Sequence, residues 1–162
     1  MKKLFIILLT LCLTTFIFAQ ETDSDYWYRE SDIGGKLVTE YVCKTDAQFN
    51  NAFKKIVKEQ LELKYDFYEP NWNLIKNSFI SLEGIKKNFP NVYSYIKDDM
   101  AMSSLDSDYK YYWCIQDLGG VYVIKLFKRV NGIVYRSLTT MDTNHQWAYT
   151  QELLTVLERN FN

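Results

Sequence analysis

The sequence predicts an α+β fold, an antiparallel sheet with a C-terminal three-stranded meander and helices packed mainly on one face. The last third of the chain alternates apolar and polar residues in three runs that are separated by two-residue turn signals. The middle of the chain has apolar residues at helical spacing, preceded by side chains that typically begin a helix. With 162 residues, 48% of them apolar and 24% charged, the composition is that of an ordinary globular domain.

The first 19 residues have the organisation of a secretory signal peptide. Lys2 and Lys3 form a positive start, residues 4–18 carry no charge, and Ala19 supplies a small residue before polar sequence begins. We therefore expect cleavage after Ala19 and export of residues 20–162 as a single α+β domain to the periplasm or the extracellular space. The alternative is an uncleaved membrane anchor, because the apolar stretch approaches the ~20 residues that cross a bilayer.

Removal of this segment leaves 17 basic and 20 acidic residues, a net charge of −3. Proteins that bind nucleic acid usually have a basic excess, so we do not expect a nucleic-acid partner. No later apolar run is long enough to cross a bilayer, so the mature chain is not expected to span a membrane.

The first elements of the mature chain are predicted from turn and cap signals. Residues 20–35 begin acidic and end in a glycine pair, which predicts a loose N-terminal arm followed by a turn. Residues 36–43 are rich in β-branched residues and predict a strand. Thr45 and Gln48 have the spacing of a capping box, so a long helix is expected from here to about Pro70.

The segment between this helix and the meander has a weaker pattern. Apolar residues between positions 71 and 80 indicate a short helix or strand. Ser81 can cap a helix that runs to Phe89, and Pro90 fits the first position of another helix to about Met102.

The meander is the strongest structural signal in the chain. Its strands are expected at 109–118, 121–130 and 133–141, because Gly119–Gly120 and Asn131–Gly132 supply the positive φ angles of tight hairpin turns. Pairing outward from each turn fixes which residues share a face. The face expected to pack on the helices holds Tyr109, Tyr111, Trp113, Ile115, Tyr122, Ile124, Leu126, Val130, Ile133 and Tyr135.

The opposite face of the meander interleaves cations with aromatic rings. It is a candidate binding surface for an acidic or carbohydrate partner, since cations and rings offer such contacts. The alternative is an ordinary solvent-exposed face. The candidate ligand-binding residues are Lys110, Tyr112, Lys125, Phe127, Arg129 and Arg136.

A last helix is expected from the second capping-box spacing, at Thr143 and Gln146. Its apolar residues lie at helical spacing and would close the domain on the sheet. These residues are Trp147, Leu153, Leu154, Leu157 and Phe161.

Two cysteines remain after cleavage, Cys43 and Cys114. In an oxidising compartment they predict one disulfide, which would stabilise the fold by roughly 4 kcal/mol. The alternative is two buried, reduced thiols that pack as small apolar side chains.

Catalytic and metal-binding signals are weak. His145 is the single histidine, so a histidine-based metal centre cannot be assembled, and no cofactor motif is present. The acidic segment that contains Asp106 and Asp108 does not have the spacing of a calcium-binding loop. The sequence therefore favours an exported, non-catalytic protein that binds a protein, carbohydrate or other ligand. The alternative function is a hydrolase that uses carboxylates or His145.

Overall fold

The computed structural model describes residues 26–33, 36–62, 69–97, 108–142, 144 and 146–161. Its antiparallel strands form one sheet in the order β1-β2-β4-β5-β6-β3, with β7 paired to β6. The strands are β1 (Trp27–Ile33), β2 (Lys36–Cys43), β3 (Ile80–Ser81), β4 (Tyr111–Asp117), β5 (Tyr122–Val130), β6 (Ile133–Met141) and β7 (Trp147–Tyr149). The helices are α2 (Asp46–Glu62), α3 (Trp72–Asn77), α4 (Leu82–Asn88), α5 (Pro90–Ile96) and α6 (Thr150–Asn160). The predicted α+β class is confirmed.

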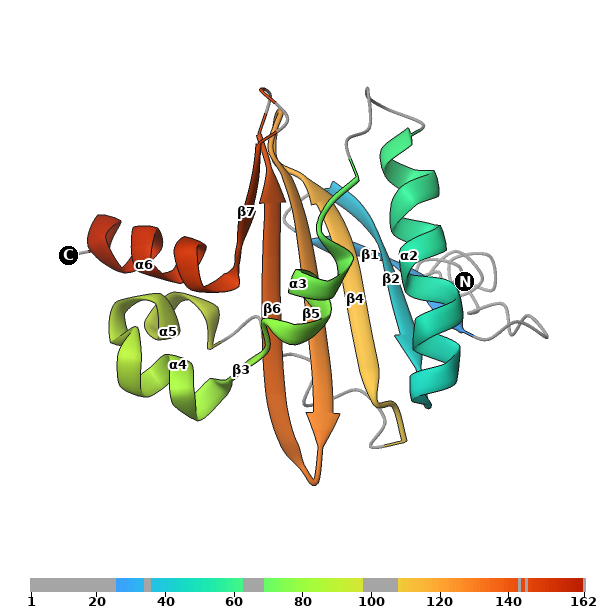
Figure 1. The fold of residues 1–162 in the computed structure, drawn as a ribbon, viewed down its shortest axis with the longest axis horizontal. Helices are drawn as coiled ribbons and strands as arrows, with labels where there is room; N and C mark the ends of the chain where they lie inside the picture. Colours follow the sequence, from blue (N-terminus) through green and yellow to red (C-terminus); the bar gives the residue numbers. More distant parts are fainter. Residues whose placement is uncertain are drawn as a thin grey trace, which may run out of the picture.

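The helices form two groups around the sheet. Figure 1 shows α2 and α3 in front of the strands, whereas α4, α5 and α6 lie together beside β6. The turn between β5 and β6 is at the lower end of the sheet in this view, close to the level at which α2 begins, and the turn between β4 and β5 is at the upper end. The two ends of the sheet therefore present different surfaces.

The predicted helix caps are present. The Gln48 amide donates to Thr45 Oγ1 at 3.2 Å, and the Thr45 amide donates to Gln48 Oε1 at 3.2 Å, so both halves of the capping box form. Ser81 caps α4, because its Oγ accepts from the Gly84 amide at 3.0 Å. Pro90 is the first residue of α5, as predicted, but that helix ends at Ile96.

The register of the meander is also confirmed. Asp117 faces Tyr122 across the first turn, and Val130 faces Ile133 across the second. The four turn residues have positive φ angles, which are 80° at Gly119, 98° at Gly120, 51° at Asn131 and 77° at Gly132. The turn chemistry therefore sets the pairing of all three long strands.

The prediction of a loose N-terminal arm is wrong for residues 27–33. They form β1, an edge strand paired antiparallel with β2. Contacts between aromatic rings hold this segment against the sheet. The ring centroids of Tyr26 and Tyr28 lie 5.9 Å and 6.4 Å from that of Tyr41, which anchors the start of β1 on the core.

The last helix begins later than predicted. Asp142 Oδ1 accepts from the amides of Asn144 and Gln146, both at 2.9 Å, and so turns the chain back along β6. Trp147–Tyr149 then pair with β6 as β7, and α6 begins at Thr150. Thr143 and His145 lie outside the described residues.

The main core lies between α2, α3 and the sheet. Trp113 is fully buried there, and its ring stacks on Tyr41 with a centroid distance of 5.4 Å. The rings of Phe49 and Phe53, on α2, meet Trp113 edge-on at 5.8 Å and 5.5 Å. The structure thus confirms the prediction that the Trp113 face packs on the helices. The prediction is wrong for Tyr109, which precedes β4 and packs against the apolar cluster on the opposite face.

A separate core joins α4, α5 and α6. Ile85 and Val92 are its most buried members, together with Leu154 from α6. The Glu158 carboxylate accepts from the backbone amides of Asn91 and Val92 at 3.3 Å and 3.0 Å. This contact places a negative charge at the start of α5 and fixes α6 against it.

Candidate functional site

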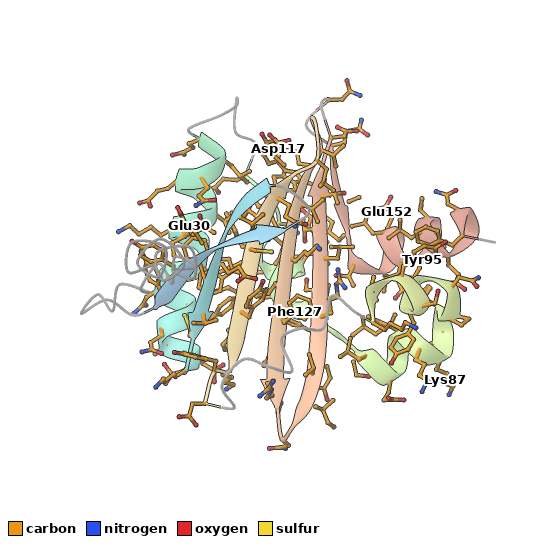
Figure 2. The ribbon with its side chains drawn as sticks, turned by 180° about the vertical axis from the view of Figure 1, so that it is seen from behind. Glu30, Lys87, Tyr95, Asp117, Phe127 and Glu152 are labelled. Atoms are coloured by element: carbon orange, nitrogen blue, oxygen red, sulfur yellow. The ribbon has the colours of Figure 1, made fainter. Side chains whose placement is uncertain are left out.

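Five of the six sequence-predicted binding residues lie on the sheet face opposite α2, and three of these five are buried. Tyr112, Phe127 and Arg136 are only 6%, 2% and 3% exposed, so the prediction of an open surface is wrong for these residues. In Figure 2 the strands around Phe127 face the viewer, with α2 to one side and α4 to α6 to the other. The side chains cover one another: the Tyr112 and Phe127 ring centroids are 5.6 Å apart, and the Arg136 guanidinium lies 5.2 Å from that of Phe127.

This face also buries a carboxylate that the sequence did not single out. Glu40 on β2 is 6% exposed and accepts a hydrogen bond from the Tyr112 hydroxyl. Burial, together with this carboxylate, raises the pKa of Tyr112. Lys125 and Arg129 are half-buried on the same strand face. The polar groups on this face lie within and beside a second apolar cluster, which contains Tyr112 and Phe127. They do not form an open binding surface.

The predicted disulfide is wrong, because Cys43 and Cys114 are free thiols on opposite faces of the sheet. Cys43 pairs with Tyr111, which is three positions from Cys114 along β4. Three strand residues span ~10 Å, and an odd separation directs side chains to opposite faces. Both thiols are buried, and burial raises the pKa of Cys114 to about 11, so that thiol is protonated near neutral pH.

Alkylation of the unfolded protein without prior reduction is expected to modify both Cys43 and Cys114. Peptide mass spectrometry measures this directly. Modification that appears only after a reductant is added would contradict the sheet register, because the observed pairing keeps the sulfur atoms apart.

Lys110 is the one predicted binding residue that does not lie on this face. It belongs to a different group of side chains, on the α2 side of the sheet. It joins Lys76 on α3 and Lys128 on β5, and we call these three residues the lysine cluster. At its centre the rings of Phe49 and Tyr111 stack with a centroid distance of 4.1 Å and an interplanar angle of 6°. The site therefore collects side chains from four separate parts of the chain.

The aromatic rings position the lysine side chains. The Lys128 Nζ lies 5.7 Å from the Tyr111 ring centroid and 5.8 Å from that of Phe79. The Lys76 Nζ lies 5.8 Å from the centroid of Phe49 and donates to Asn50 Oδ1 at 2.8 Å. Cation–π contacts of this kind hold an ammonium group near a ring without neutralising its charge.

Asp46, the first residue of α2, forms an ion pair with Lys110 and also interacts electrostatically with Lys128. Its carboxylate accepts from the Lys110 ammonium and from the Tyr111 hydroxyl. These hydrogen bonds hold the pKa of Asp46 below its usual value. Within the described part of the chain, no carboxylate oxygen lies within 4.0 Å of the ammonium groups of Lys76 or Lys128.

Apolar side chains adjoin the lysine cluster at the lower end of the sheet. Val130 and Ile133 face each other across the β5–β6 turn, and Lys128 faces Tyr135 two residues further along the strands. All four lie on the same face, because alternate residues of a strand point to the same side. Ile133 is 49% exposed, so the predicted helix-covered face is open at this end. We call Val130, Ile133 and Tyr135 the apolar strip.

The Asp46 contact predicts a pH-dependent contribution to stability. The folded-state pKa is lowered, so the stabilisation is present above the unfolded pKa of about 4 and is lost as the pH falls through the folded pKa. Asp46→Asn is expected to cost about 0.5 to 1 kcal/mol near neutral pH, a small value because Asp46 is exposed. Urea unfolding at several pH values should show this difference shrinking below about pH 4. A difference that does not change with pH would contradict the assignment.

Two features are absent from the described part of the chain. There, no group of three or more His, Cys, Asp and Glu side chains could hold a metal ion. No helix of the described segments is long and apolar enough to cross a membrane. Asp106, like His145 and the first 19 residues, lies outside the part of the chain that the structure describes.

The fold and the cluster define an α+β protein with a basic, aromatic end to its sheet. The chain matches no protein-family model, and neither a curated protein nor a solved structure is significantly similar to it. The proposed function therefore depends on the site itself.

Proposed function

We propose that the chain is an exported, non-catalytic protein that binds a partner through the lysine cluster and the adjoining apolar strip. The observation that carries the proposal is the pair of ammonium groups on Lys76 and Lys128. Both lysines are half-buried beside aromatic rings, yet neither ammonium group has a carboxylate oxygen within 4.0 Å among the described residues. Export rests on the signal-peptide pattern of residues 1–19.

Energetics support a binding role for this end of the sheet. Like charges held near one another repel, and the single Asp46 carboxylate, which is bound to Lys110 and also interacts electrostatically with Lys128, offsets only part of the charge of the three lysines. An exposed apolar side chain such as Ile133 gains nothing from contact with water. A partner that covers both features would offset the repulsion and bury the apolar strip, as charged and apolar groups do in protein interfaces.

The hydrolase alternative is less well supported at this site. A general base needs a pKa near the working pH, whereas the Lys110 and Tyr111 hydrogen bonds hold the pKa of Asp46 low. The hydroxyl of Tyr111 is no better suited to accept or lose a proton, because burial and the Asp46 carboxylate raise its pKa. The cluster can attract and orient a charged group, but it offers no residue suited to proton transfer.

The test compares export and partner capture for three forms of the protein. The wild type is compared with the double variant Lys76→Gln, Lys128→Gln and with the matched control Lys55→Gln, Lys87→Gln, which removes two exposed lysines of α2 and α4. Cell fractionation with intact-mass measurement should show the processed chain outside the cytoplasm in all three cases. Cross-linking in intact cells should give an adduct with the wild type and the control, reduced at least about tenfold in the double variant.

Two results would contradict the proposal. Unprocessed protein that stays in the cytoplasm would reject export. An adduct of equal yield in the double variant and the wild type would reject the lysine cluster as the binding surface.

A further inference from the structure

We infer that the lysine cluster and the apolar strip together recognise an acidic polypeptide segment that also carries apolar side chains. The inference rests on the proposed function and names the chemical class of the partner. Its basis is the pair Lys76 and Lys128, which have no carboxylate oxygen within 4.0 Å in the described chain, together with the exposed Ile133, which lies on the same sheet face as Lys128.

The charge of the cluster requires an acidic partner. Lys76, Lys110 and Lys128 bring three positive charges, offset in part by Asp46, to one end of the sheet. Asp46 forms its ion pair with Lys110, whereas the half-buried Lys76 and Lys128 have no carboxylate oxygen within 4.0 Å among the described residues, so an incoming carboxylate can pair with them. Complementary charges of this kind steer a partner toward the surface and fix its orientation.

A small free anion would bind too weakly to be the natural ligand. Each exposed ion pair changes affinity by roughly fivefold or less, and salt screens it further. A polymer that carries several carboxylates binds more tightly than a single anion. Once its first ion pair has formed, the other ion pairs form within the same complex. The partner is therefore expected to be a polymer with repeated negative charge.

The rings at the centre of the cluster argue against a sugar chain. Phe49 is 3% exposed and Tyr111 is 5% exposed, so neither ring face is open for stacking on a sugar. The neighbouring side chains of the apolar strip are more accessible: Ile133 is exposed, and Val130 and Tyr135 are half-buried. The side chains of peptides commonly pack against aliphatic and tyrosine side chains of this type.

The experiment measures fluorescence polarisation of three labelled peptides with the purified, processed protein. One peptide alternates Asp and Leu, the second replaces Leu by Ser, and the third replaces Asp by Ser. The Asp/Leu peptide is expected to bind most tightly, with affinity that falls as salt is added. The double variant Lys76→Gln, Lys128→Gln should bind it about tenfold or more weakly, and Lys55→Gln, Lys87→Gln should bind within about twofold of the wild type.

Ile133→Ser separates the two parts of the surface. It should weaken binding of the Asp/Leu peptide but leave binding of the Asp/Ser peptide unchanged. Ile133 is exposed beside a turn, so this substitution is not expected to unfold the protein, and thermal unfolding of each variant checks that it is folded.

Several outcomes overturn the inference. Equal losses in the two double variants would show attraction to net charge alone. Binding to vesicles of phosphatidylglycerol without binding to any peptide would identify a membrane surface in place of a polypeptide. If cross-linking in cells depends on Lys76 and Lys128 but no acidic peptide binds, the inference fails while the proposed function stands. If cross-linking does not depend on these lysines, the proposed function fails as well.

Discussion

Trp113→Ala is expected to lower the free energy of unfolding by about 3 to 5 kcal/mol, the largest effect of any substitution considered for this protein. Trp113 is fully buried between the sheet and α2. Its ring stacks on Tyr41 and meets the edges of Phe49 and Phe53, so alanine would leave a cavity that these rigid rings cannot fill. Urea unfolding followed by circular dichroism measures the loss.

Leu118→Ala is the control for this substitution. Leu118 is 57% exposed beside the Gly119 turn, so its truncation should change stability by no more than about 0.5 kcal/mol. If Trp113→Ala were as mild as this control, Trp113 could not be the centre of the core, and the face assignment of the meander would be wrong.

Tyr112→Phe is expected to cost about 1.5 to 3 kcal/mol although it removes a single oxygen atom. The Tyr112 hydroxyl donates to the Glu40 carboxylate, and both residues are 6% exposed. A hydrogen bond to a carboxylate contributes more to stability than one between neutral groups, and both partners here are removed from water. The phenylalanine ring would still contact Phe127, so the loss reports the hydrogen bond and not the packing.

The same chemical change at an exposed position provides the comparison. Tyr95 is 63% exposed, and Tyr95→Phe should stay within about 0.5 kcal/mol of the wild type. Equal effects at the two positions in urea unfolding would contradict the buried Tyr112–Glu40 contact.

The meander could be predicted from sequence because its signals are local. Gly119–Gly120 and Asn131–Gly132 specify tight turns, and alternation outward from them specifies the faces. β1 was missed although Gly34 and Gly35 separate it from β2 in the same way. Its Arg29, Glu30 and Asp32 break the apolar alternation, and the rings that hold its start contact Tyr41 only after folding.

The lysine cluster could not be predicted because its members come from distant parts of the sequence. Lys76 reaches the Phe49 ring only when α3 packs beside α2, and Lys128 reaches Phe79 only when β5 and β3 join the same sheet on the two sides of β6. Lys110 was predicted from sequence to be a binding residue, but it was assigned to the wrong face of the sheet, with Tyr112 and Phe127 as neighbours. Its ammonium turns toward Asp46, because a buried apolar cluster occupies the other face.

Site-specific photo-cross-linking tests the central claim most directly, because it reports which end of the sheet touches the partner. A photoreactive residue is placed at Ile133, beside the lower turn in Figure 1, or at Leu118, beside the upper turn. Both positions are exposed apolar residues next to hairpin turns, so they are a matched pair. Irradiation of the exported protein in cells is expected to give an adduct from position 133 and none from position 118. An adduct from position 118 alone would place the partner at the opposite end of the sheet and contradict the binding role of the lysine cluster.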